Sequence, residues 1–451
     1  MANVGKKPKP EAARLLVFNL ITQVNRQGAY ANLRLPELLS ESNLEERDRA
    51  FATELGYGTL RMQGLHDALI KRHIDRPFDE IDPGIIDLLR MGIHQVTQMR
   101  VPDHAAVGET VEVARATIGE SRASYVNALL RKTTADSSFF ADLAAIDDNK
   151  TRLALTYSHP EWEVAAFFDQ LKDWIEVEAL LQANNIPVKP HLIAWPGRST
   201  VDELMLEGGS PLAWTTNGVL SAKMPGAYQA VKERRAGVQD RGSQLVSQVF
   251  LNTATTESTL SWLDMCAGPG GKASALFTAL TEERQSDAFT ANEPSEHRAR
   301  LVAQVIPGQN VISYPGQDLP SLGMTYDRIL IDAPCTGLGA LRRRPEARWR
   351  RTPQDLKELV KTQRELLESG LALLKPDGLL AYVTCSPHLL ETKAQILETL
   401  HRHKEIELRD ISPFLPQSVP THVITADGTL QLWTHRDDAD SMYMALLARR
   451  K

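Results

Sequence analysis

Two cysteines lie in short motifs that each follow an apolar stretch of chain. Cys335 is part of Asp-Ala-Pro-Cys-Thr-Gly at 332–337, and Cys385 is part of Thr-Cys-Ser-Pro at 384–387. A thiolate is a strong nucleophile, and a carboxylate such as Asp332 can take part in the proton transfers that accompany its attack. A lone cysteine is more often a small core residue, so the signal is the pairing of two thiols with an aspartate. The spacing does not decide which thiol is the nucleophile.

A glycine-rich turn follows the apolar strand that ends at Asp264. A triphosphate-binding loop would need glycine and Ser or Thr where the chain has Cys266 and Ala273, and a dinucleotide fingerprint would need its third glycine two positions later. S-adenosylmethionine, which carries a carboxylate and an ammonium but no phosphate, suits a tight turn that lets the backbone approach a ligand closely. The turn residues that we expect to bind this cofactor are Cys266, Ala267, Gly268, Pro269, Gly270, Gly271 and Lys272.

Four acidic residues are expected at the carboxyl ends of parallel strands, which form the ligand crevice of open α/β sheets. Asp264 ends the first strand, and Glu293 ends the second, where a carboxylate can accept hydrogen bonds from both ribose hydroxyls. Asp318 follows the third strand and could face the adenine, and Asp332 ends the fourth. One such acid alone is more often a helix cap or a solvated turn. Together they predict a cofactor site to which Glu293, Asp318 and Asp332 contribute.

Methylation at carbon 5 of cytosine needs this set of groups. That carbon is too weak a nucleophile to attack a sulfonium methyl group directly, but addition of a thiolate to carbon 6 makes it enamine-like. A carboxyl group near N3 assists the addition, and a base or a second thiol removes the proton from carbon 5 so that the thiolate can leave. Nearby positive charge, such as the cofactor sulfonium, is expected to lower the pKa of the nucleophilic thiol.

The elements that must position these residues alternate along the second half of the chain. From residue 243 onward, helical periodicity alternates with short apolar runs, which predicts a doubly wound, mostly parallel α/β sheet. Residues 11–135 show only helical periodicity, and 187–241 read as a small mixed α/β segment. The predicted domains are an all-α domain at 1–140, a linker and small α/β subdomain at 141–240, and a Rossmann-like catalytic domain at 241–451.

Composition limits the class of protein. A chain of 451 residues is too long for one core, and no apolar run approaches the roughly 20 residues that span a membrane. The N-terminus lacks the apolar stretch of a secretory signal, and three cysteines are too few for a disulfide framework. We therefore expect a cytoplasmic protein without membrane association. The twelve histidines show no zinc-type spacing to the cysteines, so no metal is expected.

Three motifs together resemble the NOL1/NOP2/Sun family of RNA (cytosine-5) methyltransferases, at 266–272, 332–337 and 384–386. The helical part, with 102–114 and 125–132, resembles the NusB-type RNA-binding domain that precedes the catalytic domain in the bacterial branch of that family. The resemblance covers nearly the whole chain. It implies S-adenosylmethionine as cofactor, small-subunit (16S) ribosomal RNA as substrate, and an antiparallel last strand. We expect the protein to be a monomer.

The resemblance also implies a division of labour between the thiols. Cys385 corresponds to the nucleophile that forms a covalent adduct with carbon 6, and Cys335 to the thiol that assists product release. Asp332 is expected between cytosine and cofactor. The chain departs from the family pattern at Gly268, which replaces the second alanine of the usual turn, and in the residues that follow Glu391.

An arginine-rich run at 342–351 contains six arginines and one acidic residue. Such a run is often a solvated loop, and the net charge of −6 argues against a generally basic protein. Phosphate contacts come from local patches rather than from the average charge, and the run follows the Cys335 motif directly. We therefore predict contacts to RNA phosphates from Arg342, Arg343, Arg344 and Arg348.

Two other functions remain open. The chain could be a non-catalytic RNA-binding or ribosome-assembly factor that works through its NusB-like domain, although the intact cysteine motifs argue against this. It could also methylate DNA or protein. Cytosine-5 DNA enzymes have their nucleophile in a proline–cysteine motif after the fourth strand, which would make Cys335 the nucleophile.

Overall fold

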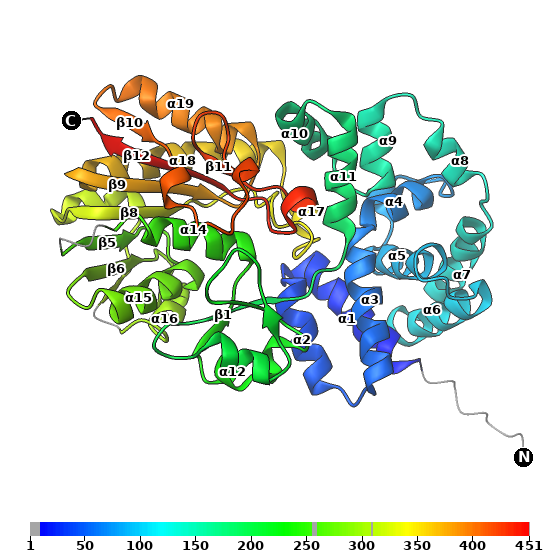
Figure 1. Cartoon of the computed structure of the whole chain (residues 1–451). Helices are drawn as coiled ribbons and strands as arrows, with labels where there is room; N and C mark the ends of the chain where they lie inside the picture. The colour runs from blue at the N-terminus through cyan, green and yellow to red at the C-terminus, as the bar shows by residue number, and fades with distance from the viewer. Residues whose placement is uncertain (1–9, 255–258, 308–309, 451) are drawn as a thin grey trace, which may run out of the picture. The chain divides into compact units, whose positions relative to one another are not determined.

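The computed structural model describes residues 10–254, 259–307 and 310–450. These residues form two compact units, each of which is described here by itself (Figure 1). The first unit contains the chain up to Asn185 and a later segment, Leu341–Arg350. The second unit contains Ile186–Ala340 and the residues from Arg351 onward.

The two units divide the chain differently from the predicted domains. We assigned 141–240 to one linker and subdomain, but its helices up to Asn185 belong to the first unit and its strands to the second. Helix α9 (Asn149–Thr156) contacts α4 (Gln63–Lys71), which lies much earlier in the chain. Packing between distant helices therefore sets the boundary, and local periodicity does not report such packing.

The first unit is built from helices, as predicted. Helix α5 (Pro83–Thr97) shows why: Pro83 occupies its first position, where no N–H is needed, and the Asp82 side chain accepts a hydrogen bond from the Gly84 amide at 2.8 Å. Leu20, Leu55 and Leu88 are fully buried in its core. The remaining helices of four residues or more are α1 (Ala12–Gln27), α2 (Ala31–Glu41), α3 (Glu46–Arg61), α6 (Asp103–Ile118), α7 (Glu120–Thr134), α8 (Phe139–Ala144), α10 (Glu161–Leu171), α11 (Trp174–Asn185) and α17 (Ala347–Arg350).

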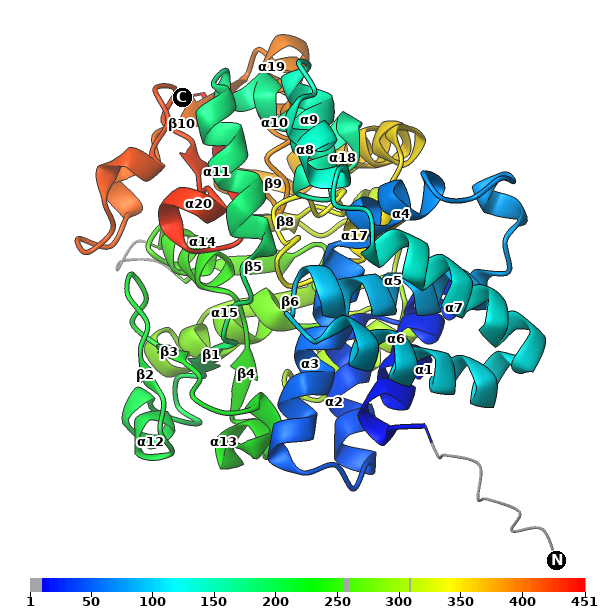
Figure 2. The ribbon, with the colours of Figure 1, turned by 90° about the vertical axis from the view of Figure 1, so that its right-hand side faces the viewer.

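A small antiparallel sheet opens the second unit, where a mixed α/β segment was predicted. Its strand order is β2-β3-β1-β4, and Figure 2 shows these strands with α12 and α13 beside them. The strands are β1 (His191–Ala194), β2 (Ser210–Pro211), β3 (Gly218–Leu220) and β4 (Ala236–Val238), and the helices are α12 (Val201–Leu206) and α13 (Gln229–Lys232).

The large sheet of the second unit has the order β10-β12-β9-β8-β5-β6-β7, with β11 paired to β12. The pairs from β9 to β7 are parallel, and β12 is antiparallel to β9, β10 and β11. The predicted fold, a mostly parallel sheet with an antiparallel last strand, is therefore confirmed. The strands are β5 (Ser261–Asp264), β6 (Ala288–Asn292), β7 (Val311–Ile312), β8 (Tyr326–Asp332), β9 (Leu374–Thr384), β10 (Ile406–Arg409), β11 (Leu430–Gln431) and β12 (Tyr443–Arg449).

Helices cover both faces of this sheet, because side chains alternate along its strands. Leu330 on β8 packs in a core with α14, α15 and α16, whereas its neighbours Ile329 and Ile331 pack on the opposite face with α18. Figure 1 shows α15 and α18 beside the strands. The covering helices are α14 (Arg241–Leu251), α15 (Gly271–Glu283), α16 (Glu296–Val302), α18 (Pro353–Leu373) and α19 (Lys393–Arg402).

Neither a membrane span nor a metal-binding cluster is found among residues 10–254, 259–307 and 310–450. No helix among them is both long enough and apolar enough to cross a membrane. In the same part of the chain, no three His, Cys, Asp or Glu side chains are grouped as they would be around a metal ion.

Candidate active site

Four neighbouring parallel strands, in the order β9, β8, β5 and β6, end at one edge of the large sheet. Asp264 ends β5 and Asp332 ends β8, while Glu293 directly follows β6 and Cys385 directly follows β9. Because parallel neighbours have their carboxyl ends on the same side, the topology brings these four residues to one crevice.

The two thiols are in contact. The Sγ atoms of Cys335 and Cys385 lie 3.4 Å apart. The hydrogen bond to Cys385, burial, and the negative charge that Cys385 carries when ionised raise the pKa of Cys335 well above its usual range. Two thiols at this distance titrate as a coupled pair, so ionisation of one opposes ionisation of the other.

Lys272 supplies the positive charge of this crevice. Its Nζ atom lies 2.7 Å from Oδ2 of Asp332, and its side chain is 9% exposed. Burial opposes the ammonium form, but the negative charges of Asp332 and Cys385 outweigh this effect and raise the pKa of Lys272. From the sequence we assigned Lys272 to the cofactor turn alone, and the structure adds an ion pair with Asp332.

Glu391 is a fully buried carboxylate that joins the two cysteine motifs. Its Oε1 atom accepts hydrogen bonds from the Thr336 amide at 2.8 Å and from the Gln363 side chain at 3.0 Å. The Thr336 hydroxyl donates to the other carboxylate oxygen and lies 3.1 Å from the Ser386 hydroxyl. Thr336 and Ser386 follow Cys335 and Cys385 in the chain, so Glu391 fixes the backbone beside both thiols.

The sequence analysis did not assign a role to Glu391 or to Gln363. Glu391 was noted only where the chain leaves the family pattern, and Gln363 lies in the middle of the long helix α18. The one available signal was an acidic residue six positions after a strand-end cysteine. Such a residue is common in surface turns, so its burial could be learned only from the tertiary structure.

The glycine-rich turn is tied to the acidic residue of the next strand. Gly270 has a φ of 111°, which glycine adopts without strain, and α15 begins at the following residue. The buried carboxylate of Glu293 accepts hydrogen bonds from the Gly268 amide at 3.1 Å and the Ser295 amide at 2.9 Å. It also pairs with Arg298 at 2.8 Å. These partners hold Glu293 close beneath the turn.

This contact explains the glycine at 268 and yields a prediction. A Cβ atom there would lie 2.1 Å from Oε2 of Glu293, which is anchored and cannot move aside freely. Gly268→Ala is therefore expected to weaken S-adenosylmethionine binding about tenfold or more, since overpacking costs about 1–3 kcal/mol. The shorter side chain of Glu293→Asp should restore much of the affinity in the double variant. Isothermal titration of the variants measures both effects, and an unaltered affinity in Gly268→Ala would contradict the prediction.

The two other strand-end acids differ in burial. Asp264 is fully buried, and its Oδ1 atom accepts a hydrogen bond from the Cys266 amide at 3.3 Å. Its Oδ2 atom has no hydrogen-bond partner among the described residues. Burial, with the negative charge of Asp332, raises the pKa of Asp264 to about 7. Asp318 is exposed in the short helix that follows β7, as the sequence placed it.

The side chains of the arginine-rich run differ in burial. Arg344 is exposed and Arg343 is half-buried. Arg348 is 0% exposed and hydrogen-bonds to backbone carbonyls within the first unit, and Arg342 is 6% exposed. The guanidinium groups of Arg342 and Arg348 are thus directed into the protein in this structure, and the RNA contacts of the run stay predictions.

Comparisons with known proteins agree with this architecture. A family model described as 16S rRNA methyltransferase RsmB/F matches residues 249–448, and a model of the NusB family matches residues 11–135. The chain is similar to the protein named putative methyltransferase MT1451 of Mycobacterium tuberculosis (strain CDC 1551 / Oshkosh), with 42% identity over 99% of this chain and 98% of that protein.

A second relative and a solved structure also match over nearly the whole chain. The relative is named probable ribosomal RNA small subunit methyltransferase B of Bacillus subtilis (strain 168), with 29% identity over 98% of this chain and 100% of that protein. The solved structure is that of PH0851, with a TM-score of 0.81, 21% identity, and coverage of 98% of this chain and 100% of the other. At this identity the structural likeness concerns the fold.

Proposed function

Because the chain belongs to the RsmB/F family of methyltransferases and carries a NusB-family domain, we propose that it methylates carbon 5 of a cytosine in small-subunit ribosomal RNA. The observation that carries the proposal is the pair of thiols, 3.4 Å apart, beside the ion pair of Asp332 and Lys272. RNA binding by a non-catalytic assembly factor does not require two adjacent thiols and a buried lysine in a crevice.

The proposed reaction begins with the Cys385 thiolate, which adds to carbon 6 of the cytosine. The new S–C6 bond moves electron density to carbon 5, while the Asp332 carboxylate holds the amidine edge of the base and a proton at N3. S-adenosylmethionine supplies the methyl group that carbon 5 receives. The proton that the thiol pair shares passes by way of solvent to N3 as the S–C6 bond forms, which leaves Cys335 as a thiolate that takes the proton from carbon 5. The S–C6 bond then breaks, N3 returns its proton to solvent, and Cys385 is released as a thiolate.

The residues of the crevice fit this cofactor. The turn from Cys266 to Lys272 leaves open space above Gly271, where a Cβ atom would meet nothing within 4 Å. The unpartnered Oδ2 atom of buried Asp264 is an acceptor that an ammonium group would satisfy. Glu293 would accept hydrogen bonds from the ribose hydroxyls, and the exposed Asp318 would contact the adenine. The cofactor would be held by these residues and the glycine-rich turn.

The test is direct. The full-length protein is incubated with radiolabelled S-adenosylmethionine and unmodified small-subunit ribosomal RNA, and the RNA is digested to nucleosides. The proposal expects the label in 5-methylcytidine. Label in another nucleoside would overturn the cytosine-5 assignment, and transfer to DNA or protein alone would favour one of the rival enzymes. A protein that binds the RNA but transfers no label to any acceptor would be the assembly factor.

The affinity for S-adenosylmethionine is expected to increase with pH. Asp264 must be ionised to pair with an ammonium, and its pKa in the free protein is about 7. Binding below that pH therefore releases a proton, so the Kd should fall by up to about tenfold per unit between roughly pH 6 and 7 and level off above. Titration calorimetry at several pH values checks this. Asp264→Asn should give a flat profile, and an equally steep one would contradict the assignment.

A further inference from the structure

The two thiols of the crevice lie within reach of each other. Their Sγ atoms are 3.4 Å apart, and a disulfide brings two sulfur atoms to roughly 2.0 Å. The strands that precede them, β8 and β9, are parallel neighbours whose last paired residues are Asp332 and Val383. Paired residues on neighbouring strands lie about 4.8 Å apart, which is within the usual Cα separation of a disulfide. Cys335 and Cys385 follow this pair closely, and their sulfur atoms have only about 1.4 Å to approach.

The backbones that carry the thiols are joined on both sides of the pair. Before the thiols, the Ala333 amide donates to the Val383 carbonyl at 2.9 Å, and after Cys335 the Gly339 amide donates to the Cys385 carbonyl, also at 2.9 Å. Groups that are held this close react with each other far faster than the same groups on separate molecules. The second unit therefore favours a bond between these two thiols over a bond to any other thiol.

Both thiols are half-buried, so the crevice leaves them open to a small oxidant. Oxidation begins at a thiolate, and the Lys272 ammonium lies near enough to Cys385 for their opposite charges to attract. A peroxide converts a thiolate first into a sulfenic acid, which an adjacent thiol captures as a disulfide. Cys335 and Cys385 have the arrangement that this second step requires.

Cys266, the third cysteine of the chain, differs from this pair. It begins the glycine-rich turn and takes no part in the contact between the sulfur atoms of Cys335 and Cys385. Burial, with the negative charges of Asp264 and Asp332, raises the pKa of the Cys266 thiol well above its usual range. A thiol that stays protonated reacts slowly with peroxides, so Cys266 is an internal reference for the pair.

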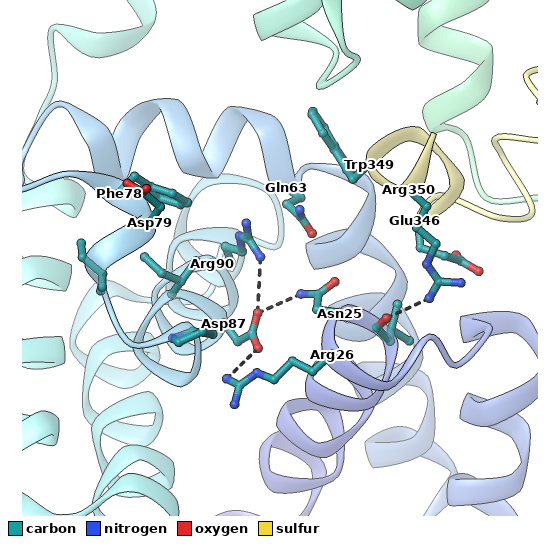
Figure 3. Close-up of a pocket in the computed structure, with 14 residues that line it drawn as sticks. Asn25, Arg26, Gln63, Phe78, Asp79, Asp87, Arg90, Glu346, Trp349 and Arg350 are labelled. Atoms are coloured by element: carbon teal, nitrogen blue, oxygen red, sulfur yellow. Dashed lines mark hydrogen bonds and ion pairs between the residues drawn. The ribbon is translucent and has the colours of Figure 1, made fainter. Parts of the chain in front are cut away.

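The first unit has no cysteine. Its pocket of about 390 Å³ contains polar side chains that bond to one another (Figure 3). Asp87 accepts hydrogen bonds there from Asn25 at 2.8 Å and from Arg26 at 3.3 Å, and it also accepts one from Arg90 at 3.3 Å. A thiol-directed oxidant therefore acts on the second unit alone.

We propose that Cys335 and Cys385 form a site of reversible oxidative modification, at which a peroxide joins the two sulfur atoms in a disulfide. One thiolate attacks the peroxide: an S–O bond forms, the O–O bond breaks, and the departing hydroxide takes a proton from solvent. The other thiol then attacks the sulfenic acid: the S–S bond forms, the S–O bond breaks, and hydroxide leaves with the thiol proton as water. Two electrons pass from the thiols to hydrogen peroxide, which becomes two molecules of water.

The consequence for catalysis rests on the proposed function. A disulfide leaves neither a thiolate to add to carbon 6 nor a thiolate to take the proton from carbon 5, so methylation stops. The disulfide also spares the sulfur atoms from the higher oxidation states, which thiols do not reduce. Because a dithiol reductant restores both groups, the protein stops methylating RNA under oxidising conditions and resumes afterwards.

The first measurement locates the bond. The reduced full-length protein is treated with a small excess of hydrogen peroxide, its free thiols are alkylated, and it is digested with trypsin without reductant. Cys335 and Cys385 fall in separate tryptic peptides, 329–342 and 365–393, since Lys375 precedes a proline and is not cleaved. Wild type should yield these peptides linked, lighter than their sum by the mass of two hydrogen atoms, and dithiothreitol should separate them.

Three variants distinguish this site from chance oxidation. Cys266→Ser is the matched control and should form the linked peptide as wild type does. Cys335→Ser and Cys385→Ser should give at least about tenfold less linked peptide of any kind, because each lacks one partner. A wild type without the linked peptide, whose thiols are oxidised singly or still free, would overturn the proposal. Equal linkage of Cys266 to either thiol would also overturn it.

The second measurement is RNA methylation by wild type before oxidation, after it, and after reduction. The rate is expected to fall at least about tenfold on oxidation and to return with dithiothreitol, because the nucleophile is lost and then restored. A linked protein that methylates RNA as fast as the reduced protein would overturn the regulatory consequence.

The two proposals fail separately. A protein that forms the linked peptide but transfers no methyl group in its reduced form retains the modification site and loses the proposed function. A reduced protein that methylates RNA but yields no linked peptide retains the proposed function and loses the modification site.

Discussion

Cys385→Ala is expected to abolish RNA methylation, with a loss of at least about 10³-fold, because the variant lacks the proposed nucleophile. The variant should still bind S-adenosylmethionine, since the turn and its acidic residues are intact. Cys335→Ala is expected to behave differently. It retains the nucleophile but lacks the base for carbon 5, so a covalent protein–RNA adduct should accumulate and appear as a shifted band on denaturing gels.

The double variant Cys335→Ala/Cys385→Ala is the control for this pair, and it should form no adduct. The opposite pattern, with adduct in Cys385→Ala and none in Cys335→Ala, would exchange the roles of the two thiols. It would support the DNA-type arrangement, in which the thiol of the Asp-Ala-Pro-Cys motif is the nucleophile.

Lys272→Met is the second change with a large expected effect. It removes the partner of Asp332 and a positive charge beside the thiols, and loss of one such electrostatic contact in an active site lowers kcat by about 100-fold or more. Lys272 also favours ionisation of the nearby Cys385, as the mutual effect on the pKa of Lys272 indicates. The rate of the variant should therefore recover partly as the pH is raised.

A pH–rate profile measures this effect. A cation beside a thiolate favours the ionised form, so its removal should move the acidic limb of kcat to higher pH by about one unit or more. Lys272→Arg keeps the charge and should move the limb little. If Lys272→Met lowers kcat by the same factor at every pH, Lys272 acts on Asp332 alone and not on the thiol.

Much of the fold could be predicted because its signals are local. Helical periodicity identified the N-terminal helices, and alternation of helices with apolar runs identified the parallel sheet. Asp264 and Asp332 could be placed at strand ends because each directly follows a short apolar run. The division into units could not be predicted in this way, since helices up to Asn185 join the first unit through contacts with residues far away in sequence.

The candidate site was predictable as a set of residue types but not as a geometry. The sequence by itself determined that two thiols and several carboxylates reach one sheet edge, because each lies beside a strand end. Only the tertiary structure decided that the thiols touch, that Lys272 pairs with Asp332, and that Glu391 holds both motifs. These contacts join segments 50 or more residues apart, which no local pattern encodes.

Arg348 shows that the burial of a charged side chain also could not be predicted from the sequence. Because a run of charged residues is ordinarily solvated, its place among six arginines predicted an exposed side chain that contacts RNA phosphates. Burial is decided by what packs around a side chain, and here the carbonyls of two helix ends and one loop surround the guanidinium. The sequence determined that this residue is positively charged. The tertiary structure decided that its guanidinium group hydrogen-bonds to backbone carbonyls inside the first unit.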